Sequence, residues 1–234
     1  MRSVFGVLVL IVAAAATTDC NTSQLATIKK CYQTYLAAFN TTFDQDLPEY
    51  WVYLHDPRMN WLLKDGVNIA QPAVCQLGNN LVQCVAGTRP CMTSHTYTQL
   101  GAYNGTEAND YQIDLAVTQY QCGAGYNILM QNFYCLESCR SSHQNLLDKC
   151  DASMKTNVIL HGLCKAAQIN ADCQANVFSN CCGHNAGVFM CNNVVQGVNA
   201  LYPECVADGK LKCQQPMLAL IQDMKAKMAM SKVL

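Results

Sequence analysis

The sequence predicts an all-α protein that is rich in disulfides. Apolar residues recur at intervals of three and four along most of the 234-residue chain, as they do on one face of a helix. No two alternating apolar–polar segments are joined by the two-residue turn of a β-hairpin. The sixteen cysteines are an even number, so all of them can pair. These observations favour a set of helices held together by covalent cross-links.

The first sixteen residues predict a secretory signal peptide. Arg2 precedes an apolar run over 4–14, and Ala14-Ala15-Ala16 supplies the small residues of a cleavage site. The run is too short and wrongly flanked for a membrane-spanning helix. All sixteen cysteines follow the expected cleavage site, and the secretory pathway is oxidising, which favours disulfides. We therefore expect a secreted, extracellular protein.

Glycosylation motifs and net charge limit the classes of binding partner that the protein can have. Asn21, Asn40 and Asn104 each begin an N-x-S/T triplet, which accepts an N-linked glycan in a secreted chain. A net charge of −1 with 13% charged residues argues against a nucleic-acid partner, which requires a basic patch. After the signal, no apolar run approaches the roughly 20 residues that span a bilayer. The expected partner is an extracellular protein, a glycan or a small apolar ligand.

The positions of prolines, glycines and capping residues predict where the helices begin and end. Thr22 or Ser23 is expected to cap the first helix, and Pro72 to open the third main one. The segment from Thr106 to Cys122 is predicted as a helix, although its alternate apolar residues also fit a strand. The expected helical segments are 24–39, two short ones from Pro48 and Pro57, 72–87, a short one after Ser94, 106–122, 126–135, 142–151, 157–179, 186–201 and one from Pro216.

Two groups of apolar side chains have alternative interpretations. An aromatic cluster could stack on sugar rings, but such residues are more often core, and we favour core. A C-terminal stripe could cover the helical core, or it could contact a lipid-like ligand or a protein, because methionine adapts to variable partners. The cluster is Tyr50, Trp51, Tyr53 and Trp61, and the stripe is Met217, Leu220, Ile221, Met224 and Met228.

Cysteine spacing predicts an internal repeat. Three spacings recur in the same order, and Cys182 and Cys213 are extra members of the second copy. The corresponding groups are Cys20-x10-Cys31 with Cys139-x10-Cys150, Cys75-x8-Cys84-x6-Cys91 with Cys164-x8-Cys173-x7-Cys181, and Cys122-x12-Cys135 with Cys191-x13-Cys205. We expect two tandem cysteine-rich helical units, packed as one body and followed by a helix, with the boundaries 17–135, 136–213 and 214–234.

The repeat also constrains the cross-links. The first copy has seven cysteines and the second nine, so at least one bridge must join them. Cys164 and Cys173 are nine residues apart, which places them on opposite sides of a continuous helix. Each such helix is therefore expected to bridge to two different neighbours.

No catalytic or metal-binding motif is evident. Cys181-Cys182-Gly183-His184-Asn185 is similar to the active-site helix of secreted phospholipase A2, but it is one residue short and has Asn where that family needs Asp. No C-x-x-C pair occurs, the nearest spacing being Cys135-x3-Cys139, so a zinc site is disfavoured. We therefore predict no enzyme, metal or cofactor. The alternative, a diverged lipolytic hydrolase, requires His184 beside a carboxylate.

The chain resembles a group of nematode secreted cysteine-rich proteins that carry a domain of unknown function, and it is also similar to the chondroitin proteoglycan 4 domain. The likeness rests on the signal peptide, Cys20-x10-Cys31 with CYQTYLAAF, the cluster from Cys164 to Cys191, and YQCGAGY at 120–126. It implies an extracellular helical protein. No Ser-Gly dipeptide for chondroitin attachment occurs. The expected function is a non-enzymatic extracellular binding or structural role; a carrier of a small apolar ligand in a helical cavity is the alternative.

Overall fold

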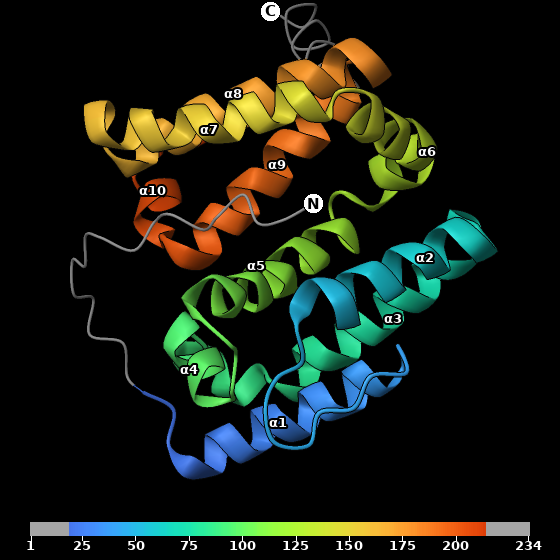
Figure 1. The fold of residues 1–234 in the computed structure, drawn as a ribbon, viewed down its shortest axis with the longest axis vertical. Helices are drawn as coiled ribbons and strands as arrows, with labels where there is room; N and C mark the ends of the chain where they lie inside the picture. The colour runs from blue at the N-terminus through green and yellow to red at the C-terminus, as the bar shows by residue number, and fades with distance from the viewer. Residues whose placement is uncertain (1–18, 214–234) are drawn as a thin grey trace, which may run out of the picture. The chain divides into compact units, whose positions relative to one another are not determined.

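The computed structural model describes residues 19–213, and over this range the predicted all-α fold is confirmed (Figure 1). No β-strand occurs among these residues. The predicted signal peptide and the helix from Pro216 lie outside the described residues. No helix within the described range is both long and apolar enough to cross a bilayer, in agreement with the sequence.

The described chain forms two compact units. The first comprises residues 19–126 together with 196–203, and the second comprises 127–195 together with 204–213. The predicted first unit ended at residue 135. In the structure the first segment of that unit ends at Tyr126, and Cys135 lies in the second unit.

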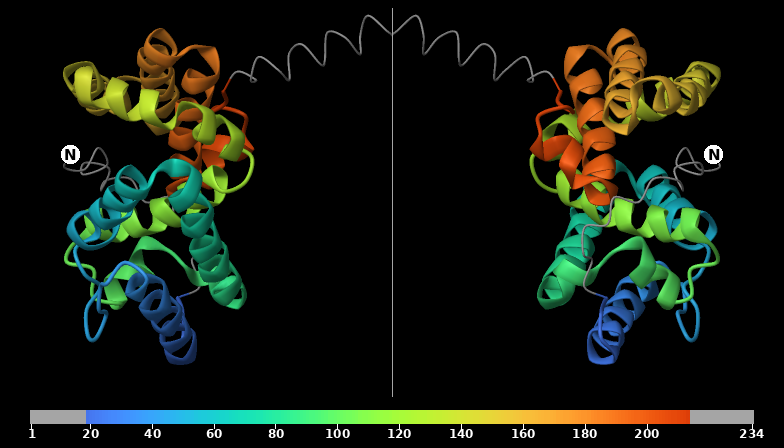
Figure 2. Two further views of the ribbon diagram at one scale, coloured as in Figure 1. Left: turned by 90° about the vertical axis from the view of Figure 1, so that its right-hand side faces the viewer. Right: turned by 90° about the vertical axis from the view of Figure 1, so that its left-hand side faces the viewer.

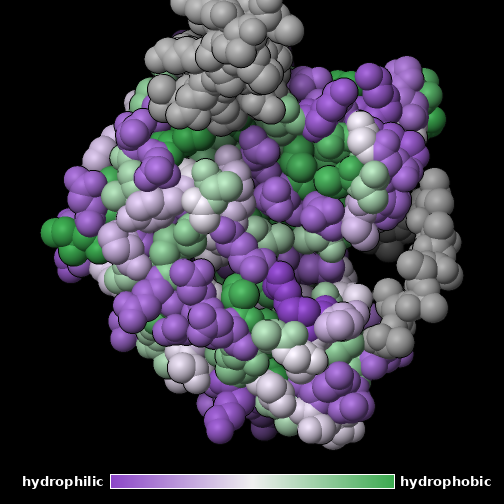
Figure 3. All heavy atoms as spheres, turned by 180° about the vertical axis from the view of Figure 1, so that it is seen from behind, coloured by the Kyte–Doolittle hydropathy of each residue, from purple (hydrophilic) through white to green (hydrophobic). Residues whose placement is uncertain are grey.

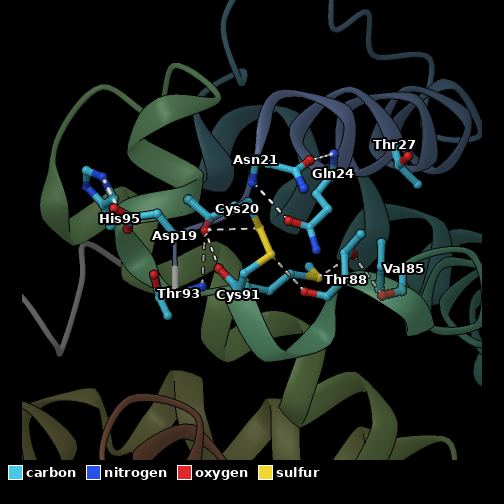
Figure 4. The surroundings of a disulfide bond; sticks show 12 residues. Asp19, Cys20, Asn21, Gln24, Thr27, Val85, Thr88, Cys91, Thr93 and His95 are labelled. Carbon is cyan, nitrogen blue, oxygen red and sulfur yellow. Dashed lines mark hydrogen bonds and ion pairs between the residues drawn. A yellow bond between two sulfur atoms is a disulfide. The ribbon is translucent and has the colours of Figure 1, made fainter. Parts of the chain in front are cut away.

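The first helix, α1 (Thr22–Ala37), begins after Asn21 rather than after Thr22 or Ser23. The Asn21 side chain accepts a hydrogen bond from the Gln24 backbone N–H, and the Gln24 side chain accepts one from the Asn21 N–H, each at 2.9 Å (Figure 4). This reciprocal capping box satisfies two N–H groups that a helix start otherwise leaves free. The prediction of the cap was wrong by one residue because asparagine caps as well as serine does.

A π-helical turn, η1 (Trp51–His55), leads into α2 (Asp56–Asp65), and Gly66 at φ 82° then starts α3 (Val67–Cys84). Pro57 lies in the first turn of α2, as predicted. Pro72 does not open a helix but lies inside α3, which was wrongly predicted. Proline costs one helical hydrogen bond there. Burial of Val67, Ala70 and Val74 on either side of Pro72 favours the continuous helix nonetheless.

A 3-10 turn, η2 (Ala86–Cys91), and two helices, α4 (Ser94–Gln99) and α5 (Gly105–Gln121), complete most of the first unit. The segment that fitted either a helix or a strand is therefore helical. Gly101 precedes α5 at φ 92°, and a Cβ there would lie 2.6 Å from the Asp46 Cα. Only glycine fits this close approach.

Five helices follow. The helix predicted to end at residue 151 continues to His161, and Gly162 at φ 78° separates it from the next one. Figures 1 and 2 show these two long helices lying side by side. The five are α6 (Tyr126–Ser142), α7 (Gln144–His161), α8 (Leu163–Cys182), α9 (His184–Leu201) and α10 (Pro203–Ala207).

The first unit has an aromatic core. The rings of Tyr97 and Tyr111 stack at 6.0 Å, and Tyr32 meets both of them edge to face. The buried hydroxyls of Tyr32 and Tyr97 form a hydrogen bond at 2.8 Å. Of the predicted aromatic cluster, Tyr50 is buried in this core, and Tyr53 is half exposed. The prediction of a core role is therefore right for Tyr50, and Trp51 and Trp61 pack against the same core.

The second unit is built differently, around the α7–α8 pair. Its buried side chains on α8 are mostly small, and one of them is the amide of Asn170, which is fully buried and 3.6 Å from the Met154 sulfur. Small side chains allow these two helices to approach closely but bury little apolar surface themselves. Helices α6 and α9 bury larger apolar side chains, such as Phe133 and Phe189. The buried residues of this pair are Leu147, Cys150, Met154, Ala166, Ala167, Asn170, Ala171 and Phe178.

Candidate functional site

All sixteen cysteines are paired, which confirms complete disulfide formation. The bridges are Cys20–Cys91, Cys31–Cys84, Cys75–Cys122, Cys135–Cys182, Cys139–Cys181, Cys150–Cys173, Cys164–Cys205 and Cys191–Cys213. Figure 4 shows the first of them, which ties the start of α1 to the end of η2.

Three bridges of each unit follow the same order. Among six cysteines taken along the chain, the first pairs with the fifth, the second with the fourth and the third with the sixth. The two sets are Cys20, Cys31, Cys75, Cys84, Cys91, Cys122 and Cys139, Cys150, Cys164, Cys173, Cys181, Cys205. Under this order Cys122 corresponds to Cys205, whereas the spacing had matched it with Cys191. The tandem repeat itself stays a prediction.

The connectivity agrees with the helical geometry. Cys164 and Cys173 of α8 bridge to Cys205 and Cys150, two different neighbours, as their opposite positions on the helix required. The bridge Cys135–Cys182 joins the predicted unit 17–135 to the predicted unit 136–213, as the odd cysteine counts of these two units required. In the units of the structure, however, every bridge closes within one unit.

The three predicted glycosylation sites are exposed. Asn21 and Asn104 cap α1 and α5 with their side-chain oxygens, which leaves the amide nitrogen, the atom that carries a glycan, outside the capping bond. Asn40 has a φ of 57°, a conformation that asparagine tolerates. The surface position fits the predicted modification, which stays a prediction.

One histidine lies beside a disulfide. The His143 Nδ1 is 3.5 Å from the Cys181 sulfur, and the ligand-type atoms of Cys139, His143 and Cys181 lie within 4.8 Å of one another. The two sulfurs are bonded to each other, so neither is a thiolate that could bind a metal. His184, on which the hydrolase alternative depends, is the first residue of α9.

Helix α5 carries a stripe of buried carboxylates that the sequence analysis missed. Glu107, Asp110 and Asp114 are each 7% exposed and lie on one face of the helix. Glu107 accepts hydrogen bonds at 2.8 Å from the backbone N–H groups of Tyr50 and Tyr103. The available signal was the spacing of the three carboxylates themselves, three and four residues apart, which places them on one face of a helix.

Asp114 forms a buried ion pair with Arg58 of α2. The guanidinium donates to both carboxylate oxygens, with one contact at 3.2 Å, and the Tyr50 hydroxyl donates to the same carboxylate at 2.8 Å. The side chains of Arg58 and Asp114 are only 11% and 7% exposed. Such a pair costs desolvation energy and is retained only with this complete bonding.

Asp110 has no cation of its own. The Trp51 indole N–H donates to it at 3.1 Å. Burial raises the pKa of Asp110 to about 7, the Trp51 hydrogen bond opposes this shift, and the negative charges of Glu107 and Asp114 add to it. The stripe is buried inside the first unit, and the hydrogen-bond partners found for it are other residues of that unit.

Open hollows occur on the described surface of both units. A hollow of about 490 Å3 on the first unit is lined by apolar residues, by four amide side chains and by Arg89, whose guanidinium donates to Gln119. The amide of Gln112 is also bonded, to the Ala200 carbonyl oxygen and the Ser94 hydroxyl. Part of the polar lining of this hollow is therefore bonded within the first unit.

The hollow of the second unit is a groove of about 460 Å3 between α7 and α8. Leu146, Val177 and the Cys150–Cys173 bridge supply apolar surface, and Lys149 and His143 supply the basic groups. None of its lining residues is acidic. Apolar surface with a few polar groups is typical of a small-molecule site.

Outside these hollows, the described surface carries both hydrophobic and hydrophilic residues. Figure 3 shows one face on which hydrophobic residues lie in separate patches among hydrophilic ones. Ile159 and Leu160, near the end of α7, are 86% and 66% exposed. No family model, curated protein or solved structure matches the chain.

Proposed function

We propose that this protein is a secreted, N-glycosylated, disulfide-locked helical protein that binds an extracellular partner or forms an extracellular structural component. The observation that carries the proposal is the pairing of all sixteen cysteines. Eight bridges do not persist in a reducing cytosol, whereas extracellular proteins keep them. The predicted signal peptide and the exposed Asn21, Asn40 and Asn104 support the same compartment.

A binding role is favoured over catalysis by the state of the titratable groups. Arg58 and the carboxylates of α5 form a cluster that is buried and bonded internally. A catalytic acid or base has to reach a proton on the substrate. The cysteines are likewise engaged in bridges, so none of them offers a thiolate nucleophile.

Expression of the full chain in cultured animal cells tests the proposal. We expect the protein in the medium, with no thiol that iodoacetamide can alkylate until a reductant is added. Enzymatic removal of N-glycans should lower its mass, and Asn→Gln substitution at all three acceptors should abolish that change. Retention inside the cell, or free thiols in the native protein, would overturn the proposal.

A carrier of a small ligand is the second candidate. The α7–α8 groove favours it, because its volume of about 460 Å3 lies within the range of roughly 300–1,000 Å3 of small-molecule sites. The groove is open to solvent, whereas an enclosed cavity was the form expected for a carrier. A ligand held there would keep one side exposed.

A further inference from the structure

We propose that the α7–α8 groove binds a small apolar molecule that carries one carboxylate, of the fatty-acid class. This inference rests on the binding role proposed above and names the site and the chemistry of the ligand. Two long helices form its walls. Residues of the first half of α7 face residues of the second half of α8, because the two helices run antiparallel after the Gly162 turn.

The apolar part of the groove suits a hydrocarbon chain. Leu146 is 40% exposed and presents part of its side chain to the groove. Val177, Cys181 and the Cys150–Cys173 bridge line the same groove. Covering such surface yields about 25 cal/mol for each Å2 removed from water. The Cys150–Cys173 bridge joins α7 to α8 and fixes the distance between them, so the groove is preformed.

The polar part of the groove suits an anion. Lys149 is exposed and makes no ion pair with any described residue. Asn176 and Asn180, one turn apart on α8, have side-chain amides that make no hydrogen bond within the described range. An ammonium group and two amide groups can all donate to a carboxylate.

The absence of acidic residues from the lining decides between ligand classes. His143 adds a second basic group at one end of the groove, where its Nδ1 contacts the Ser142 hydroxyl at 2.9 Å. A cationic amphiphile would find no counter-charge among the lining residues, and a neutral lipid would gain no charge contact with Lys149. An apolar carboxylate satisfies both parts of the groove.

A direct test uses a fatty acid that carries an environment-sensitive fluorophore, such as dansyl-undecanoic acid, titrated into the full secreted protein. We expect saturable binding in the micromolar range, displacement by unlabelled palmitate and weaker displacement by palmitate methyl ester. Lys149→Glu should raise the Kd about tenfold, since a favourable charge contact becomes a repulsion.

Two further variants make the test specific. Lys155→Glu introduces the same charge change on α7 at an exposed position outside the groove and should leave the Kd unchanged. Asn176→Trp fills the groove and should weaken binding whatever the head group.

The inference is overturned if the probe does not bind saturably, if the methyl ester competes as well as the acid, or if Lys155→Glu weakens binding as much as Lys149→Glu. None of these outcomes affects secretion, glycosylation or thiol count, so the proposed compartment is tested separately. Failure of secretion with intact probe binding would reject the compartment and keep the site.

Discussion

The two units reach a stable helical fold by different means. The first contains a large aromatic core with a buried ion pair, and three disulfides. The second is shorter, buries aliphatic side chains with phenylalanine as the only type of buried aromatic residue among its described residues, and contains five disulfides. Each disulfide stabilises the fold by restricting the unfolded chain, so five of them in the shorter unit supply a larger share of its stability. The comparison indicates that cross-links contribute more to the second unit, and an aromatic core with a buried ion pair contributes more to the first.

Breaking the buried ion pair should produce the largest effect. Arg58→Met leaves the Asp114 charge buried without its cation, which should cost about 3–5 kcal/mol of unfolding free energy. Both tryptophans belong to the first unit, so their fluorescence during urea unfolding reports this loss.

The matched control is Arg140→Met in the second unit, where unfolding is followed by hydrogen exchange of α6 because both tryptophans lie in the first unit. Arg140 lies 3.8 Å from Glu137 in a more exposed pair, so the loss there should be at most about 0.5 kcal/mol. Similar losses for the two variants would show that the Arg58 pair does not hold the first unit.

Removal of a single bridge should affect only its own unit. Cys150 and Cys173 are 23 residues apart, and Cys31 and Cys84 are 53 apart. Replacement of either pair by alanine should cost about 3–4 kcal/mol by loop entropy. Hydrogen exchange measured by mass spectrometry should show faster exchange in α7 and α8 for the first variant and in α1 and α3 for the second. Equal changes in both units would contradict independent cross-linking.

The carboxylate stripe predicts a pH dependence confined to the first unit. The folded pKa of Asp110, about 7, exceeds its unfolded value of 3.8, so the folded state binds more protons between these pH values. Stability should therefore fall by roughly 2–4 kcal/mol as the pH rises from 4 to 8. Asp110→Asn should remove most of this slope in urea titrations at several pH values.

Asp151 of α7 provides the counterpart in the second unit. Burial raises its pKa to about 6, and the Gln174 hydrogen bond opposes the shift. This side chain is partly exposed, so Asp151→Asn should reduce the loss of stability between pH 4 and 8 by only about 1 kcal/mol. A slope that survives Asp110→Asn unchanged would place the titrating group elsewhere.

The smallest effect concerns the helix cap. Asn21→Ala removes the capping bond of α1 and should cost about 1 kcal/mol, whereas Asn21→Ser keeps a capping oxygen and should cost a few tenths. Both substitutions remove the glycan acceptor. Unfolding of the two variants by urea therefore separates the cap from the glycan. Equal stability of the two would show that the capping bond contributes nothing.

Much of the fold could be predicted because its determinants are local. The helical spacing of apolar residues predicted the all-α class, and the nine-residue separation of Cys164 and Cys173 predicted that they bridge to different helices. Pro72 was misplaced because packing of the residues around it outweighs the cost of one lost hydrogen bond.

The interior of the first unit could not be predicted in the same way. Glu107, Asp110 and Asp114 look like solvent-facing residues in the sequence, since carboxylates are rarely buried. Their burial depends on Arg58 and Trp51, more than fifty residues away along the chain. The α7–α8 groove likewise depends on the order in which the cysteines pair, which spacing alone leaves open.

Complete reduction tests the central claim most directly. The protein would be reduced with a phosphine at neutral pH, and hydrogen exchange would be measured segment by segment against the oxidised protein. The account predicts that α2, α3 and α5 keep much of their protection and the native tryptophan emission, while α7 and α8 exchange like an unfolded chain. Retained protection in α7 and α8, with loss in α2, α3 and α5, would contradict it.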